Sequence, residues 1–314
     1  MNPNKYQDKI YETLGMRDCN LQIEAVAGSG KTTTLVEIAK RLPSDKKVAV
    51  ICFNKETANQ FEGRFPTNCH CITLHAMGCM ILRENGMWFK INSRKVDNLL
   101  KYDILGYGKD QWKSVDKVDV DFYYEHRKNI LKLVSIFKGM GISSLDYIGD
   151  QFQTVCERFG IDLGDEALSI KGIVCQLYEL SIHKEKTIDF DDMILFPVFM
   201  GLKFPHYDYV LIDEVQDLNI CQRMFVEKWK GTARIIAVGD RHQSIYGFRG
   251  ADANSMDEFS KAFNPKHLDL SICYRCSKAV VEEANKIVPY IEAAEDALPG
   301  IVKEIHEETM EDII

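Results

Sequence analysis

The residues best suited to chemistry begin with the run Ala25-Val26-Ala27-Gly28-Ser29-Gly30-Lys31-Thr32. Glycines let backbone N–H groups curl around phosphate oxygens, and a helix that follows directs its positive end at them. In such a P-loop the lysine contacts the β- and γ-phosphates, and the Thr32 hydroxyl is a ligand for Mg²⁺. Ala25 stands where the pattern usually has its first glycine. The segment predicts a site for ATP with Mg²⁺.

An acidic pair, Asp213-Glu214, ends a second apolar run that begins at Val210. Asp213 is expected to hold Mg²⁺, and Glu214 to orient or deprotonate an attacking water. Phosphoryl transfer depends mainly on positioned charge, so this pair complements Lys31. Lys31 and Asp213 alone would also allow another P-loop enzyme, such as a nucleotide kinase.

The elements that must position these residues alternate along the chain. We expect strands at 21–26, 48–53, 71–74, 209–212, 234–238 and 266–270, with helices such as 34–42 and 56–65 between them. This alternation predicts an α/β fold with a mainly parallel sheet. Residues 85–184 instead show helical periodicity, which predicts a helical insertion with helices at 96–105, 123–137, 151–159 and 170–182. A further strand is expected near 300–305.

Composition narrows the class of protein. The 314 residues are 46% hydrophobic and 27% charged, which suits about two globular domains. The sequence shows no run of about 18 apolar residues and no apolar signal region, so we expect no membrane partner and a cytoplasmic or nuclear location. The net charge of −8 is uneven: residues 85–138 carry eleven basic and seven acidic residues. That stretch is either a phosphate-binding face or a solvated helix surface.

Two polar clusters allow alternatives. The ten cysteines are scattered, which favours free thiols in a reducing compartment, although Cys69-His70-Cys71 with Cys273-x-x-Cys276 would be the residues of a zinc site. Asp189, Asp191 and Asp192 either cap a helix start or form a cation-binding cluster, and capping is the preferred interpretation.

Several motifs together carry a resemblance to a known family. Asp213-Glu-Val-Gln-Asp217 and the segment Val238–Asp252 resemble those of UvrD/Rep-like superfamily 1 DNA helicases. Five further segments agree in order: Asn4-x-x-Gln7, Cys52–Lys55, Thr73–His75, Thr187–Ile194 and Leu270–Ser277. The resemblance covers roughly residues 4–302, and the Phe-Asn-Lys motif is closest to the phage-type or F-box-type branch. It implies a RecA-like P-loop domain 1A over 1–84 and 185–270, a 1B-like insertion at 85–184 and the incomplete start of a second RecA-like domain 2A at 271–314.

The resemblance also implies roles for matching residues. Catalysis would involve Lys31, Glu214, Gln243 and Arg275. ATP would contact Gln7, Ala27, Gly28, Ser29, Gly30, Lys31, Thr32, Thr33 and Tyr274, with Mg²⁺ on Thr32 and Asp213. Single-stranded DNA would lie along Phe53, Asn54, Lys55, Thr73, His75, Tyr246, Phe248 and Arg249. Aromatic side chains on such a track stack on bases with about 1–3 kcal/mol each and little sequence preference.

The implied function is an ATP-dependent helicase or translocase that moves 3′→5′ on single-stranded DNA and acts on fork or overhang DNA. Two residues depart from the pattern: Thr33 replaces an arginine and Phe248 a tryptophan. The later family motifs do not follow Arg275, so we expect an N-terminal portion whose second motor domain is completed by a C-terminal remainder or a protein partner. The alternative is an ATP- and DNA-binding module or regulatory fragment without autonomous unwinding.

Overall fold

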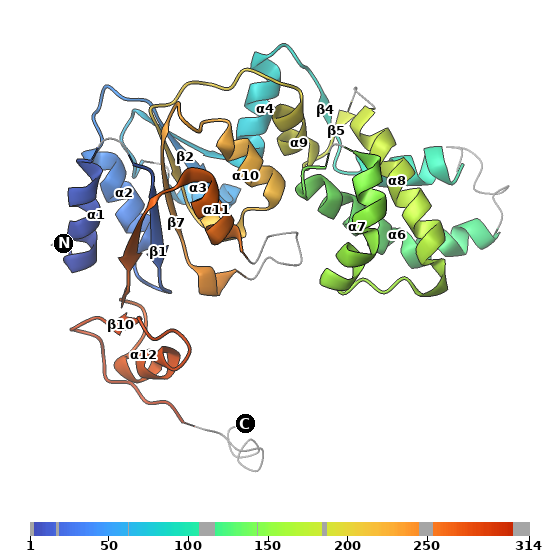
Figure 1. The fold of residues 1–314 in the computed structure, drawn as a ribbon. Coiled ribbons are helices and arrows are strands. Elements are labelled where there is room, and N and C mark those ends of the chain that lie inside the picture. Colours follow the sequence, from blue (N-terminus) through green and yellow to red (C-terminus); the bar gives the residue numbers. More distant parts are fainter. Residues whose placement is uncertain are drawn as a thin grey trace.

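The computed structural model describes residues 3–16, 19–61, 63–106, 117–142, 144–183, 187–244 and 254–303. One six-stranded sheet is formed by β1 (Leu21–Ala25), β2 (Val48–Cys52), β3 (Cys69–Thr73), β6 (Tyr209–Ile212), β7 (Arg234–Gly239) and β8 (Lys266–Leu270). All neighbouring strands are parallel, in the order β3-β2-β6-β7-β1-β8 (Figure 1). The predicted α/β fold with a parallel sheet is confirmed.

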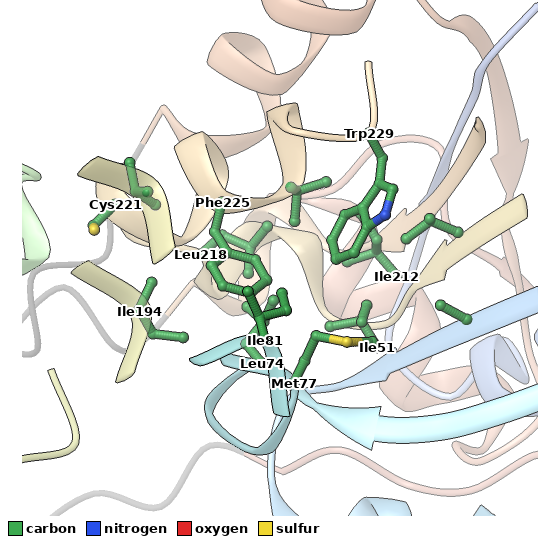
Figure 2. Packing of buried hydrophobic residues seen from close by; sticks show 14 of the residues in the cluster. Ile51, Leu74, Met77, Ile81, Ile194, Ile212, Leu218, Cys221, Phe225 and Trp229 are labelled. Carbon is green, nitrogen blue, oxygen red and sulfur yellow. The ribbon is translucent and has the colours of Figure 1, made fainter. Parts of the chain in front are cut away.

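Helices cover both faces of this sheet because its strands are apolar on both sides. One face packs against α1 (Lys5–Leu14), α2 (Lys31–Arg41) and α3 (Lys55–Phe61). The other face packs against α4 (Leu74–Glu84), α9 (Asp192–Phe199), α10 (Ile220–Glu227) and α11 (Ser255–Phe263). Figure 2 shows side chains of the second core, in which the rings of Phe225 and Trp229 meet edge-on with centroids 5.8 Å apart. The strands are thereby held rigidly, with their carboxyl ends at one edge.

The segment between β4 (Lys90–Ile91) and β5 (Thr187–Ile188) forms a separate helical body beside the sheet (Figure 1). Its elements are α5 (Lys95–Asn98), a π-helical turn (Leu99–Ile104), α6 (Lys117–Gly139), α7 (Leu145–Arg158), a 3₁₀ turn (Gly164–Glu166) and α8 (Ala167–His183). These helices share a core of their own that includes Leu100, Ile130, Phe137, Ile170 and Val174. The short strands β4 and β5 pair in parallel where the chain enters and leaves this body.

A buried ion cluster joins the helical body to the sheet domain. Lys138 Nζ lies 2.6 Å from Asp189 Oδ2 and 2.7 Å from Asp192 Oδ1, and all three side chains are buried. Lys95 Nζ lies 2.7 Å from Asp192 Oδ2 and donates to the carbonyl of Ser181. Asp189 Oδ1 also accepts a hydrogen bond from the backbone N–H of Asp192 at the start of α9. The N-cap residue of α9 is Asp191, and its side chain makes no capping hydrogen bond, so the bond to Asp189 is the part of the predicted capping that the structure shows. The cluster also pairs with the ammonium groups of two lysines.

After β8 the chain leaves the sheet and forms β9 (Ile272–Cys273), α12 (Lys278–Asn285) and β10 (Glu292–Ala293), which lie below the sheet in Figure 1. Strands β9 and β10 pair in parallel. Two 3₁₀ turns, Val215–Asp217 and Arg241–Gln243, follow β6 and β7 at the carboxyl edge of the sheet. None of the helices in the described ranges is long and apolar enough to cross a membrane.

Several element boundaries differ from the predicted ones. The third strand ends at Thr73, not at residue 74, because the Thr73 hydroxyl accepts a hydrogen bond from the N–H of Ala76 and starts α4. The helix predicted to reach residue 65 ends at Phe61, shortly before Gly63, whose φ of 72° is not helical. The helix predicted at 96–105 is a short α-helix followed by a π-helical turn. Residues 300–303 are not a strand, and 304–305 lie outside the described residues.

Candidate functional site

The P-loop connects the end of β1 to the start of α2. Gly28 and Gly30 have positive φ angles of 70° and 82°, which residues with side chains rarely adopt. Gly30 is the N-cap of α2 and Lys31 is its first residue. The Ser29 hydroxyl is buried and has no hydrogen-bond partner in the described part of the chain. Free N–H groups at the helix start, its positive end and this hydroxyl suit a bound phosphate.

A cavity of about 330 Å³ opens at this loop. It is lined by Gly28, Ser29, Gly30, Lys31, Thr32, Glu214, Gln243, Tyr274 and Arg275. These include every residue predicted to be catalytic: Lys31, Glu214, Gln243 and Arg275. The structure therefore brings together residues from four separate parts of the chain. The other residues predicted to contact nucleotide or Mg²⁺ do not line it: Gln7, Ala27, Thr33 and Asp213.

Opposite charges meet at the cavity wall. Lys31 Nζ lies 2.6 Å from Glu214 Oε2, and both side chains are largely screened from solvent. Glu214 has a φ of 54°, in the left-handed region that residues other than glycine seldom occupy. Such backbone strain persists only where the surroundings enforce it, and it is common at functional sites. Here it aims the carboxylate at the lysine of the P-loop.

Gln216 supports Glu214 and was not among the predicted site residues. Its Nε2 donates to Glu214 Oε2 at 2.8 Å, and its Oε1 accepts from the N–H of Asp240 at 3.0 Å. A Cβ on Gly239 would lie 2.5 Å from that Oε1 and 2.8 Å from Cγ1 of Val215, so any other residue there would displace one of these side chains. Gln216 thus ties the ends of β6 and β7 together. The position of Gln216 inside the Asp213–Asp217 motif indicates that it belongs to the site. The motif does not reveal which groups its amide binds.

Two buried aspartates border the site. Burial is the main cause that raises the pKa of Asp213 to about 7, and the nearby charge of Glu214 adds to it. The positive charge of Lys31 lowers the pKa of Asp213 and offsets part of this rise. The same causes raise the pKa of Asp217 to about 7. Asp217 Oδ1 is buried without a hydrogen-bond partner within the described residues. Carboxylates in this condition favour a proton or a cation, which fits the Mg²⁺ role predicted for Asp213.

The segment after β9 lies directly on the P-loop. The backbone N–H of Tyr274 donates to the carbonyl of Gly28 at 3.0 Å. A Cβ on Gly28 would lie 2.6 Å from Cβ of Arg275 and 3.2 Å from Sγ of Cys273. Gly28 is therefore required twice, by its positive φ and by this close contact. The contact holds Tyr274 and Arg275 at the mouth of the cavity.

Tyr274 is linked to the first helix. Its hydroxyl accepts a hydrogen bond from Asn4 Nδ2 at 2.9 Å, and its side chain is 51% exposed. Asn4 and Gln7 form a capping box at the start of α1, and Gln7 Nε2 donates to Thr34 Oγ1 at 3.1 Å. Gln7 thus lies near α2 and is connected to Tyr274 through Asn4. Contact of Gln7 and Tyr274 with ATP stays a prediction.

The described residues predicted to bind DNA follow two adjacent strands at the carboxyl edge of the sheet. Phe53 and Asn54 lie between β2 and α3, and Lys55 is the first residue of α3. Thr73 is the last residue of β3, and His75 lies in the first turn of α4. The Asn54 and Thr73 side chains each accept a backbone N–H at these helix starts, at 2.7 and 3.2 Å. The strand pairing places the two segments side by side. Tyr246, Phe248 and Arg249 lie outside the described residues.

Phe190 is a further aromatic residue at this edge that the sequence did not single out. Its ring meets His75 edge-on, with ring centroids 6.1 Å apart, and the side chain is 54% exposed. Burial lowers the pKa of His75, which favours a neutral imidazole. The sequence signal for Phe190 is its place in the Thr187–Ile194 segment, between aspartates whose pattern predicts a helix cap.

The cysteines do not form a metal centre in the part of the chain that the structure describes. No group of three or more His, Cys, Asp or Glu side chains there is placed to hold a metal ion. All ten cysteines are free thiols.

Comparisons with known proteins agree with these features. A family model described as the UvrD/REP helicase N-terminal domain matches residues 4–264. The F-box DNA helicase protein 1 of Schizosaccharomyces pombe is 30% identical over 290 residues, 84% of this chain and 30% of that protein. A probable DNA helicase II homolog of Rickettsia felis is 25% identical over 315 residues, covering 92% and 44%. The ATP-dependent DNA helicase PcrA of Leuconostoc citreum is 25% identical over 314 residues, covering 91% and 39%. The chain spans less than half the length of each of these relatives.

Proposed function

Because this chain belongs to the UvrD/Rep helicase family, we propose that it carries the ATP-hydrolysing half of a motor that translocates on single-stranded DNA and separates strands. The observation that supports this best is the cavity in which Lys31, Glu214, Gln243 and Arg275 meet. Each of these side chains suits one part of phosphoryl transfer.

The proposed roles follow from position and charge. Lys31 binds the β- and γ-phosphates, since an arriving phosphate would compete with Glu214 for its ammonium group. Glu214, released from Lys31, orients and deprotonates the attacking water. Gln243 and Arg275, which line the same cavity, contact the γ-phosphate. Thr32 and Asp213 would hold Mg²⁺, which neutralises charge on the phosphate oxygens when it is bound. Ala27 and Thr33 flank the loop.

Single-stranded DNA is proposed to lie along the carboxyl edge of the sheet. Phe53, His75 and Phe190 offer aromatic faces, and Lys55 is exposed beside them for phosphate contact. We assign contact with the same single-stranded DNA to Tyr246, Phe248 and Arg249. The proposal also includes fork or overhang DNA as the substrate and 3′→5′ movement. It includes a second motor domain that is supplied by further chain or by a partner.

The domain division is part of the same proposal. Residues 1–84 and 185–270 form domain 1A around the sheet, 85–184 form the 1B-like insertion, and 271–314 begin domain 2A. Support comes from the separate core of the helices between β4 and β5, and from the departure of the chain from the sheet after β8.

The first experiment measures ATP hydrolysis by this chain with and without single-stranded DNA, and with Lys31→Ala as the control. We expect turnover that DNA stimulates and that the Lys31→Ala variant lacks. Turnover equal in the variant would overturn the assignment of the cavity as the ATP site. Binding of nucleotide and DNA without turnover would favour the binding-module alternative.

A further inference from the structure

The 3₁₀ turn Arg241–Gln243 brings Gln243 to the proposed ATP cavity from the end of β7. Gln216 holds the start of this turn, because its Oε1 accepts a hydrogen bond from the N–H of Asp240 at 3.0 Å. The carbonyl of Gln216 also accepts the Ser244 hydroxyl at 3.4 Å, just after the turn. These contacts fix the turn on one side only.

Arg241 fixes the same turn from a second side, although it does not line the cavity. Its Nε lies 2.8 Å from Glu24 Oε1, and its Nη2 lies 3.0 Å from Asp257 Oδ1. Further N–H groups of the guanidinium reach the second oxygen of each carboxylate at 3.5 Å. Contacts to both oxygens of a carboxylate fix the plane of a guanidinium as well as its position. Strand β1 and helix α11 therefore both hold Arg241.

Glu24 has a second partner, Tyr290, at the same carboxylate oxygen. The Tyr290 hydroxyl donates to Glu24 Oε1 at 3.2 Å, and the Tyr290 ring centroid lies 5.9 Å from that of His242 in the turn. Burial, and after it the charge of Glu24, raises the pKa of Tyr290 to about 12, so the phenol keeps the proton that it donates. Glu24 thus contacts two segments that are distant in the sequence.

The segment of Tyr290 leads to the other side of the cavity. Tyr290 lies two residues before β10, which pairs in parallel with β9. Strand β9 continues directly into Tyr274 and Arg275, which line the cavity. The carboxylate of Glu24 therefore joins the turn that carries Gln243 to the unit that carries Arg275. These are the two residues proposed to contact the γ-phosphate.

We propose that Glu24 is a positioning residue for ATP hydrolysis, which acts through Arg241 and Tyr290 to place Gln243 and Arg275 together at the cavity. The inference rests on the proposed function, since it requires that the cavity binds ATP. Glu24 does not line the cavity, so its effect on nucleotide affinity is small. A partly exposed ion pair also contributes little to stability, whereas a small misplacement of groups that act on the reacting atoms slows the reaction strongly.

The test measures hydrolysis by the full chain at saturating ATP, Mg²⁺ and single-stranded DNA. Glu24→Gln keeps the shape of the side chain and removes its charge. We expect kcat to fall about tenfold, while the ATP dissociation constant and the midpoint of urea unfolding stay unchanged. Tyr290→Phe removes one hydroxyl and should lower kcat about threefold. Glu37→Gln breaks a comparably exposed ion pair, with Arg41 on α2, and should change none of these values.

A double variant tests whether Glu24 and Tyr290 act together. Because both act through one carboxylate, Glu24→Gln combined with Tyr290→Phe should be no slower than Glu24→Gln alone. Independent effects would multiply to a loss of about thirtyfold.

Amide hydrogen exchange, followed by mass spectrometry with ATP and Mg²⁺ bound, tests the positioning without requiring turnover. The N–H of Gln243 donates to the Asp240 carbonyl, and the N–H of Tyr274 donates to the Gly28 carbonyl. We expect Glu24→Gln to speed exchange in both segments and Glu37→Gln to change it in neither.

Failure of this inference and failure of the proposed function give different results. Normal kcat in folded Glu24→Gln, with hydrolysis abolished in Lys31→Ala, overturns the positioning role while the ATP site stands. Multiplied losses in the double variant, or a loss of ATP affinity or stability as large as the loss of kcat, also overturn it. Folded wild-type protein that binds no ATP overturns both. If the wild type binds ATP without turnover, unchanged exchange of either segment in Glu24→Gln overturns the inference.

Discussion

At the scale of single residues, Glu214 combines strain, charge and support. Its left-handed backbone, its 2.6 Å contact with Lys31 and its hydrogen bond from Gln216 all fix one carboxylate oxygen. Residues so constrained are typical of catalytic positions. The pairing with Lys31 also implies that phosphate binding and release of the carboxylate are coupled.

Glu214→Gln is expected to lower DNA-stimulated ATP hydrolysis by about 10²–10⁴-fold, because the amide cannot accept the proton of the attacking water. ATP affinity should be kept or should rise, because Lys31 loses its competing partner. Both are measured by steady-state hydrolysis and equilibrium titration. Glu37→Gln, at a half-buried glutamate of α2 that pairs with Lys40 and Arg41, is the matched control and should leave both values unchanged. Near-normal hydrolysis in Glu214→Gln would exclude Glu214 as the base.

The raised pKa of Asp213 predicts a pH dependence of stability. The folded pKa of about 7 lies above the ordinary value of 3.8, so the folded state binds more protons between these pH values. Its contribution to the free energy of unfolding therefore falls as pH rises from about 4 to 7, with a limiting slope of about 1.4 kcal/mol per pH unit. Asp213→Asn removes this titration. The difference in stability between variant and wild type, from urea unfolding at pH 5 and pH 8, should shift in favour of the variant at pH 8. A constant difference would contradict the raised pKa.

At the scale of elements, the strand, turn and helix of the P-loop could be predicted because glycine spacing and apolar periodicity are local signals. The end of β3 could not be predicted, because it depends on a hydrogen bond from the N–H of Ala76 to the Thr73 hydroxyl, which caps α4. The π-helical turn at Leu99–Ile104 was equally hidden, since its spacing differs little from that of an α-helix. Local sequence decides the presence of an element better than it decides the residue where the element ends.

Gly28→Ala tests the contact between the P-loop and the segment after β9. The added Cβ would meet Cβ of Arg275 at 2.6 Å, and both backbones must separate. We expect ATP affinity to fall at least about tenfold, in a titration of the folded variant. Gly63→Ala is the matched control, since its φ of 72° carries the same backbone strain but nothing lies within 4 Å of the new Cβ. Equal affinities in the two variants would show that the contact does not position the nucleotide site.

At the scale of the whole molecule, residues that are distant in the chain meet in two places. One is the cavity at the P-loop, and the other is the buried ion cluster between the helical body and the sheet. The motifs predicted which residues meet in the cavity, because the resemblance supplied their roles. The motifs did not predict the ion cluster, because Lys95 and Lys138 precede Asp189 and Asp192 by many residues and carry no pattern of their own. The same holds for Phe190, whose place at this edge of the sheet is revealed only by its contact with His75.

Lys138→Met is expected to lower the free energy of unfolding by about 3–5 kcal/mol, because it leaves two buried aspartates without their main partner. Lys128→Met, at an exposed position on the same helix, should change it by no more than about 0.5 kcal/mol. Urea unfolding followed by circular dichroism measures both. Equal stability of the two variants would mean that the ion cluster contributes nothing to the free energy of unfolding.

The order of the sheet has a consequence for synthesis on the ribosome. β1, which carries the P-loop, is complete at residue 25, yet its two neighbours, β7 and β8, begin at residues 234 and 266. At roughly 5–20 residues per second, the strand waits on the order of ten to forty seconds for its first native neighbour, while the entire helical body is translated. Both of its edges are templates for wrong pairing during that interval. The nascent chain therefore needs shielding at its amino-terminal strand, and the ATP loop becomes fixed only near the end of translation of the described residues.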